Sequence, residues 1–133
     1  MDAAGIAVVP ELLSHGEFDV DEGVERGRAL LQMADPPTAI LTGNDLQALG
    51  VYQAARELRL HTPEDVSVVG FDDLPVARWV GPPLTTVRQP LIEMAVEAAE
   101  MVLRIAGGER VTQSRVELAT ELISRDSTAP PKA

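Results

Sequence analysis

The stretch Ser67-Val-Val-Gly-Phe-Asp-Asp73 decides the fold class of this 133-residue chain. An apolar run of this length, bounded by turn signals, is typical of a central strand of a parallel sheet that is buried on both faces. Two carboxylates follow the run directly. In open parallel sheets, ligands bind beyond the carboxyl ends of the strands, so Asp72 and Asp73 are the first candidates for a binding site.

Strand and helix patterns alternate on the N-terminal side of this run. Asp19 with Glu22, and Asn44 with Gln47, have the spacing of residues that cap the start of a helix. Hydrophobic periodicity predicts strands over 6–9, 38–41 and 66–71 and helices over 20–34 and 45–58. This alternation with short connections predicts an α/β fold with a parallel sheet. Asn44 and Asp72 then lie just past the ends of their strands, at one rim of the sheet.

The pattern changes after Asp73. We expect a loop over 74–83, an extended segment over 84–87, a helix over 91–105, a strand over 116–123 and a loose tail over 126–133. The helix has an apolar face formed by Leu91, Met94, Ala95, Ala98, Met101, Val102 and Ile105. Leaving seven such side chains of ~100 Å² each in water would forgo on the order of 10 kcal/mol. We therefore expect the chain to hide this face, against its own sheet or against another copy.

Composition and charge limit the classes of function. The net charge is −10, with 11 basic and 21 acidic residues, so the chain by itself is not expected to bind nucleic acid. There is no cysteine, and His15 and His61 lack partners at metal-ligand spacing, so we expect neither a metal nor a cofactor. No apolar run approaches the roughly 20 residues of a membrane helix, and the N-terminus lacks a basic signal region. We expect a cytoplasmic protein without membrane contact.

Four motifs in register carry a resemblance to a known family. They are Asn44-Asp45, Pro63-Glu-Asp-Val-Ser-Val-Val-Gly-Phe-Asp-Asp73, Pro83-Leu-Thr-Thr-Val87 with Gln89-Pro90, and Leu122-Ile-Ser-Arg-Asp-Ser-Thr128. In order and spacing the chain resembles the LacI/GalR family of bacterial transcription regulators over about residues 16–128. The resemblance implies a periplasmic-binding-protein-like type I fold, with a three-layer α/β/α lobe and a mainly parallel sheet.

The resemblance also implies a division of the chain. The family has a DNA-binding headpiece, a hinge and a two-lobed effector-binding sensor domain, and only the C-terminal part of the sensor has a counterpart here. Residues 1–88 would be the C-terminal lobe, and 89–108 a crossover helix that packs on the other lobe in the family. Residues 109–125 would be the returning segment with the last strand, and 126–133 a loose tail. We expect such a fragment to supply half of an effector cleft.

The resemblance assigns effector contacts to four residues. Asp72 would accept hydrogen bonds from effector hydroxyls or amines, because a carboxylate accepts two donors with charge assistance, whereas Asp73 is expected to be structural. Asn44 and Gln89 match cleft positions, although an Asn before a helix is also an ordinary N-cap. Phe18 falls where the family often carries an aromatic ring that stacks on a sugar. The alternative for Phe18 is a hydrophobic staple beside the helix start.

The same resemblance suggests the partners and the function. The family dimerises through this lobe, so we expect a homodimer with Trp79, Val80, Val51 and Tyr52 at the contact, or one that exchanges C-terminal helices. The expected function is that of the effector-sensing part of a repressor, which binds a sugar and biases operator binding through a headpiece of the parent protein. Two alternatives stay open: a lobe of a free-standing sugar-binding transport protein, and an α/β enzyme. An enzyme is not favoured, because no nucleophile or third carboxylate accompanies Asp72 and Asp73.

One residue departs from the family pattern. Arg59 stands where the family usually has a glycine that ends the helix before the Pro-Glu-Asp turn. We expect either a different helix end or a left-handed backbone at Arg59, which a side chain makes unfavourable.

Overall fold

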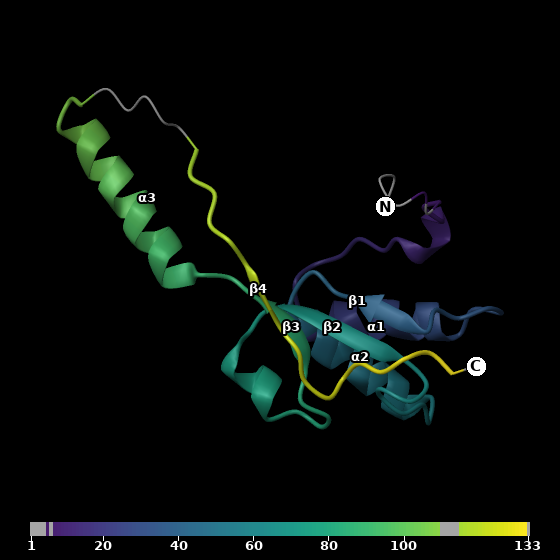
Figure 1. The fold of residues 1–133 in the computed structure, drawn as a ribbon. Coiled ribbons are helices and arrows are strands. Elements are labelled where there is room, and N and C mark those ends of the chain that lie inside the picture. Colours follow the sequence, from purple (N-terminus) through teal and green to yellow (C-terminus); the bar gives the residue numbers. More distant parts are fainter. Residues whose placement is uncertain (1–4, 6, 110–114, 133) are drawn as a thin grey trace.

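The computed structural model describes residues 5, 7–109 and 115–132, and its body is built on one four-stranded sheet (Figure 1). The strands are β1 (Ala39–Leu41), β2 (Ser67–Asp72), β3 (Thr85–Arg88) and β4 (Glu121–Ile123), and they lie side by side in that order. β1, β2 and β3 are parallel, and β4 is antiparallel to β3. The predicted α/β class and mainly parallel sheet are confirmed.

Two helices, each with a capped N-terminus, pack on one face of this sheet. α1 (Val20–Leu31) begins at Asp19, whose carboxylate accepts a hydrogen bond from the Glu22 amide at 2.8 Å. α2 (Asp45–Glu57) begins at Asn44, whose amide oxygen accepts from the Gln47 amide at 2.8 Å. Both predicted caps are confirmed, and α1 ends three residues before the predicted position 34. The backbone of Arg59 is left-handed, with φ of 59°, which is the second of the two alternatives expected for this residue.

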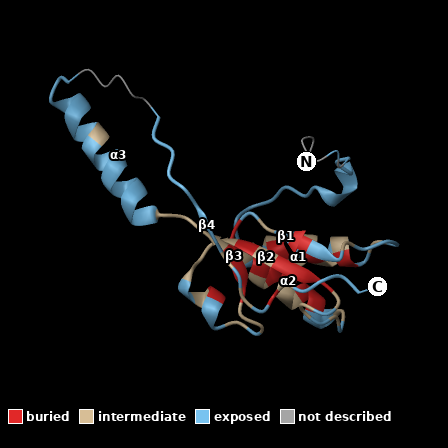
Figure 2. Cartoon of the chain, in the orientation of Figure 1, coloured by how far each residue is buried: buried red, intermediate tan, exposed pale blue. Residues whose placement is uncertain are grey.

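The core lies between the helices and one face of the sheet (Figure 2). It consists of Leu31, Ile40, Ala48, Val51, Ala54, Ala55, Val66, Val68, Ala77 and Leu84. On β2, Val68 and Gly70 are buried toward this core, whereas Val69 and Phe71 on the opposite face are only half-buried. The prediction that this strand is buried on both faces is therefore wrong. The described residues supply no complete layer over the second face.

Close contact between α1 and α2 requires glycine at the crossing. A Cβ atom on Gly50 would lie 2.3 Å from the Val20 carbonyl oxygen, and one on Gly23 would lie 2.4 Å from the Gln47 carbonyl oxygen. Both obstacles are backbone atoms, which cannot rotate away as a side chain does. The two helices therefore depend on these glycines for their distance.

Gly50→Ala is expected to lower the free energy of unfolding by about 2–3 kcal/mol, because α1 and α2 must move apart to admit a methyl group. Urea unfolding followed by circular dichroism measures the change. Gly107→Ala is the matched control, since a Cβ there would meet no atom outside its neighbours closer than 3.4 Å. Equal stability of the Gly50→Ala protein and the parent would contradict the close helix contact.

Two predicted strands are wrong in whole or in part. Within the predicted strand over 6–9, Ile6 lies outside the described residues and 7–9 pair with no strand; a short 3-10 helix, η2 (Pro10–Leu12), follows. Of the predicted strand over 116–123, only β4 forms. In both segments the sequence has apolar residues suited to a strand, but the described residues provide no neighbouring strand with which they could pair.

The C-terminal residues are fixed to the sheet as far as Ala129, so the expectation of a loose tail is wrong for 126–129. Ser127 is fully buried: its hydroxyl donates to the Val68 carbonyl oxygen at 2.6 Å and accepts from the Thr85 amide at 2.8 Å. The Ala129 amide donates to the Ser67 hydroxyl oxygen at 3.1 Å. These bonds attach the segment to β2 and β3.

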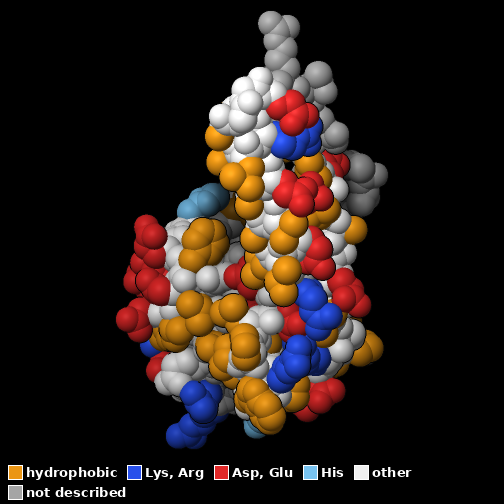
Figure 3. Space-filling view, turned by 90° about the vertical axis from the view of Figure 1, so that its left-hand side faces the viewer, with side chains coloured by type: hydrophobic (Ala, Val, Ile, Leu, Met, Phe, Trp, Pro, Cys, Tyr) orange, Lys and Arg blue, Asp and Glu red, His pale blue; other side chains and the backbone are white. Residues whose placement is uncertain are grey.

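The helix predicted over 91–105 forms as α3 (Leu91–Ala106) and projects away from the body (Figures 1 and 2). None of its residues is buried, so it does not pack on the chain's own sheet, which was one of the two expected ways to hide its apolar face. In the space-filling view, hydrophobic side chains run along this projecting part and continue onto the body below (Figure 3). Across the described ranges, no helix has the length and apolar character to cross a bilayer.

Candidate functional site

Asp72 and Gln89 meet at the carboxyl edge of the sheet. Asp72 is the last residue of β2, and Gln89 follows the end of the neighbouring strand β3. The Gln89 side-chain amide donates a hydrogen bond to Asp72 Oδ1 at 2.6 Å, and both residues are half-buried. The structure thus brings together two of the four predicted effector residues.

The backbone at this edge is strained. Asp72 has φ of 108° and Asp73 has φ of 55°. Positive φ is unfavourable for residues with a side chain, and such strain occurs preferentially at functional sites, where the surrounding structure must enforce it. Two consecutive strained residues at a strand end indicate that the direction of the Asp72 carboxylate is imposed by its neighbours.

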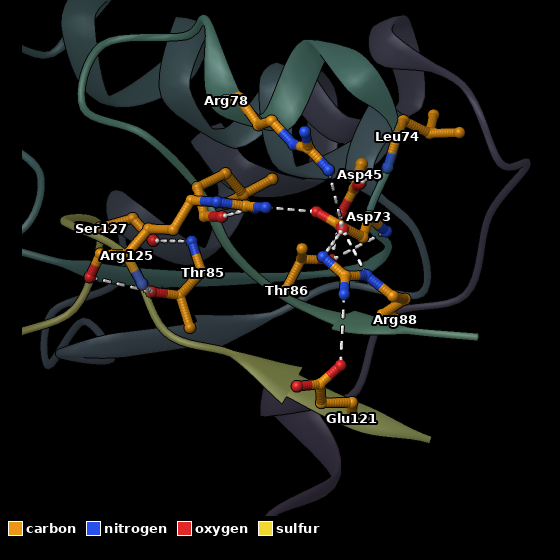
Figure 4. A network of polar contacts seen from close by, with 11 residues as sticks. Asp45, Asp73, Leu74, Arg78, Thr85, Thr86, Arg88, Glu121, Arg125 and Ser127 are labelled. Atoms are coloured by element: carbon orange, nitrogen blue, oxygen red, sulfur yellow. Dashed lines mark hydrogen bonds and ion pairs between the residues drawn. The ribbon is translucent and has the colours of Figure 1, made fainter. Parts of the chain in front are cut away.

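Asp73 forms the centre of a cluster of arginines (Figure 4). Its side chain is only 2% exposed, and its two oxygens accept from Arg125 at 2.5 Å and from Arg88 Nε at 2.8 Å; Arg78 lies 3.9 Å away. Arg125 also donates to the Leu84 carbonyl oxygen at 2.7 Å. The predicted structural role of Asp73 is confirmed, because its carboxylate is fully engaged inside the protein.

The ion pairs of Asp73 determine how its carboxyl group titrates. Burial alone would raise the pKa of Asp73, but the hydrogen bonds from Arg125 and Arg88 outweigh it and hold the pKa below the ordinary value of 3.8. A lowered pKa in the folded state stabilises the fold above the ordinary pKa. That contribution is lost as the pH falls through the lowered value.

The parent chain is therefore expected to lose stability more steeply than Asp73→Asn between about pH 4 and pH 2. Urea unfolding at several pH values in this range measures the two slopes. The other carboxyl groups are shared by both proteins and cancel in the comparison. Parallel slopes would contradict the assigned ion pairs.

Asn44 and Phe18 lie together beside the end of β1. Asn44 is 8% exposed; its side-chain amide donates to the Phe18 carbonyl oxygen at 3.1 Å while its oxygen caps α2. Phe18 is 65% exposed, and its ring lies over Gly43, where a Cβ would be 2.7 Å from the ring. Asn44 therefore has a structural role in this arrangement, and its effector contact remains a prediction, as does that of Phe18.

Asp45 is a functional candidate that sequence reasoning missed. Its side chain is completely buried; Oδ1 accepts from the Thr86 hydroxyl at 2.6 Å and Oδ2 accepts from the Leu74 amide at 2.7 Å (Figure 4). Burial raises the pKa of Asp45 above its ordinary value. The sequence signal was available in the Asn44-Asp45 motif, but no pattern indicated that the second residue points inward.

The residues predicted for a dimer contact occupy different environments. Trp79 is 84% exposed, and Val80 is half-buried against the core. The Tyr52 hydroxyl donates to the Pro82 carbonyl oxygen at 3.0 Å. Val51 is 3% exposed, and it lies against Gly27 of α1. The prediction for Val51 is wrong, because this side of α2 is used by the chain's own core.

A separate apolar groove of about 460 Å³ lies between the N-terminal segment, α1 and β1. Val8, Leu12, Leu30 and Ile40 are among the residues that line it, and none of the four predicted effector residues does. The groove is therefore distinct from the rim at Asp72. Within the described ranges, no group of His, Cys, Asp or Glu side chains could hold a metal ion.

Known proteins share both this sequence and this fold. The family description of the periplasmic binding protein-like domain matches residues 1–128. The HTH-type transcriptional repressor CytR of Escherichia coli is 36% identical over 124 residues, which are 93% of this chain and 36% of that protein. Among solved structures, the transcriptional regulator CelR in complex with cellobiose superposes with a TM-score of 0.88 and 38% identity, over 94% of this chain and 38% of that chain.

A LacI family transcriptional regulator from Lactobacillus casei with bound sucrose is also similar. Its TM-score is 0.80 and its identity 32%, over 96% of this chain and 47% of that chain. This chain thus spans between about a third and a half of the length of these relatives. It belongs to the periplasmic binding protein-like domain family, in the form that LacI-family transcriptional regulators carry.

Proposed function

We propose that this chain is the effector-sensing part of a cytoplasmic LacI-type repressor, and that it binds a sugar at the rim formed by Asp72 and Gln89. The observation that carries the proposal is the Asp72 carboxylate, held by a strained backbone at the carboxyl edge of the sheet and bonded to the Gln89 amide. Relatives of known structure with bound cellobiose and sucrose support a sugar as ligand. Operator DNA would be bound by another part of the parent protein, because this chain is strongly acidic.

The chemistry of the rim suits a polyhydroxylated ligand. Asp72 has an oxygen that accepts from Gln89 and further lone pairs that can accept from two sugar hydroxyls. The exposed Phe18 ring offers an apolar face to the carbon side of a sugar ring, and Asn44 stands beside it. The role is recognition: a ligand that binds two arrangements of the lobes with different affinities shifts the equilibrium between them.

Titration of this chain with cellobiose, sucrose, D-glucose and D-ribose tests the proposal, with binding followed by calorimetry and thermal shift. We expect weak saturable binding, with a Kd of about 1 mM or above, because half a cleft provides only part of the contacts. Absence of any shift at saturating concentrations of all four sugars would overturn the sugar assignment. Submicromolar binding would contradict the half-cleft architecture.

We further propose that two copies associate through α3. Its exposed apolar side chains, among them Ile92, Val102 and Leu103, have no cover within the described chain, and their burial would contribute several kcal/mol. Light scattering is expected to give about twice the mass of 14.2 kDa. Val102→Glu should return the protein to a monomer. Trp79→Ala should leave the dimer intact, which distinguishes a contact through α3 from the contact predicted at Trp79. A monomeric parent at high concentration would contradict the dimer.

A further inference from the structure

Asp45 connects three elements that surround the rim. It is the first residue of α2, its Oδ1 is bonded to Thr86 of β3, and its Oδ2 is bonded to the backbone amide of Leu74. The Thr86 hydroxyl oxygen also accepts from the Asp73 amide at 3.4 Å. The buried carboxylate and its hydroxyl partner therefore hold two consecutive amides, those of Asp73 and Leu74, immediately after Asp72.

Gly70 of β2 provides the space that the Asp45 carboxylate occupies. A Cβ atom on Gly70 would lie 2.2 Å from Asp45 Oδ1, so any side chain there would displace it. Among the described residues, no cation pairs with Asp45, although burial of a carboxylate without an ion pair is unfavourable. The contribution of Asp45 is then to geometry. Its hydrogen bonds fix the backbone after Asp72, so that Asp72 and Asp73 stay in the left-handed region.

We propose that Asp45 is a positioning residue that holds Asp72 and Asp73 in their strained backbone conformation and so directs the Asp72 carboxylate toward the effector. Asp45 is completely buried and does not itself touch the effector. The inference rests on the proposed effector site at Asp72. Consecutive residues with positive φ persist only where neighbouring groups enforce them, and the amides that follow Asp72 are the groups held here.

Hydrogen exchange measured by NMR tests the positioning role without any ligand. In Asp45→Ala, exchange of the Leu74 amide, taken relative to that of the central Val68 amide, is expected to be at least about tenfold faster than in the parent. Asp45→Asn should restore most of the protection, because its oxygen accepts from Leu74 while its amino group donates to Thr86. Val66→Ala is the matched control, since Val66 is buried beside the opposite end of β2.

An equal change of this ratio in Asp45→Ala and Val66→Ala would overturn the proposal, because Asp45 would then only stabilise the fold. If Asp45→Ala fails to fold, Thr86→Val removes the hydroxyl alone and is expected to speed exchange at both Asp73 and Leu74. Unchanged exchange in Thr86→Val would also overturn the proposal. Neither result depends on the identity of the effector.

Titration of the same proteins with cellobiose connects the positioning role to binding. Affinity is expected to fall about tenfold in Asp45→Ala, to recover in Asp45→Asn and to be unchanged in Val66→Ala at temperatures where all are folded. Equal losses in Asp45→Ala and Val66→Ala would overturn the inference. If the parent binds no sugar at all, the proposed function fails, while the exchange experiment still decides whether Asp45 positions the rim.

Discussion

Asp73→Ala is expected to lower the free energy of unfolding by about 3–5 kcal/mol, the largest loss of stability from a single change at the rim. The substitution removes a carboxylate that is 2% exposed and leaves Arg125, whose side chain is 14% exposed, without its charged partner. It also leaves alanine at a position with a left-handed backbone, which its Cβ makes unfavourable and which no side-chain contact then stabilises. Urea or thermal unfolding followed by circular dichroism measures the loss.

Two variants separate the causes of this loss. Asp73→Asn keeps the shape of the side chain, and asparagine tolerates a left-handed backbone. The difference in free energy of unfolding between Asp73→Ala and Asp73→Asn therefore reports the backbone strain and the side-chain oxygen that alanine lacks. Asp65→Ala breaks an ion pair with Lys132 on the surface and is expected to change stability far less. If Asp73→Ala and Asp65→Ala destabilised the protein equally, the arginine cluster would not stabilise the fold as described.

Asp72→Asn is expected to weaken binding of cellobiose or sucrose by about 10- to 100-fold. The reason is that hydrogen bonds to a charged group contribute about 1.5–3 kcal/mol each, and the neutral amide replaces one acceptor by a donor. Calorimetric titration at several protein concentrations measures the change. Stability should stay near that of the parent, because Asp72 is half-buried and Asn tolerates positive φ.

The matched control for Asp72 is Asp35→Ala, which changes the net charge by the same amount at an exposed position. Its sugar affinity is expected to equal that of the parent. Gln89→Ala should have an intermediate effect, because Gln89 supports Asp72 through one hydrogen bond. Unchanged affinity in Asp72→Asn would place the sugar somewhere other than this rim.

Most of the fold could be predicted because it depends on local patterns. The helix caps at Asp19 and Asn44 and the apolar run of β2 are short-range signals, and the structure agrees with them to within a few residues. The strand prediction was wrong for residues 7–9 and for residues 116–120, and for one common reason. A strand is stabilised by its neighbours, and apolar alternation within a segment does not say whether a neighbour is present.

The site could be predicted only in part. The sequence by itself determined that carboxylates stand at the end of a central strand, and that Asp72 and Gln89 lie at the carboxyl ends of strands. The family resemblance already predicted a structural role for Asp73, but only the tertiary structure showed how its carboxylate is held, because that depends on the left-handed backbone and on arginines distant in sequence, such as Arg125. The tertiary structure also decided that Asp45 points inward and that Val51 belongs to the core. The physical reason is that burial and partner choice arise from contacts between elements, which spacing along one chain does not specify.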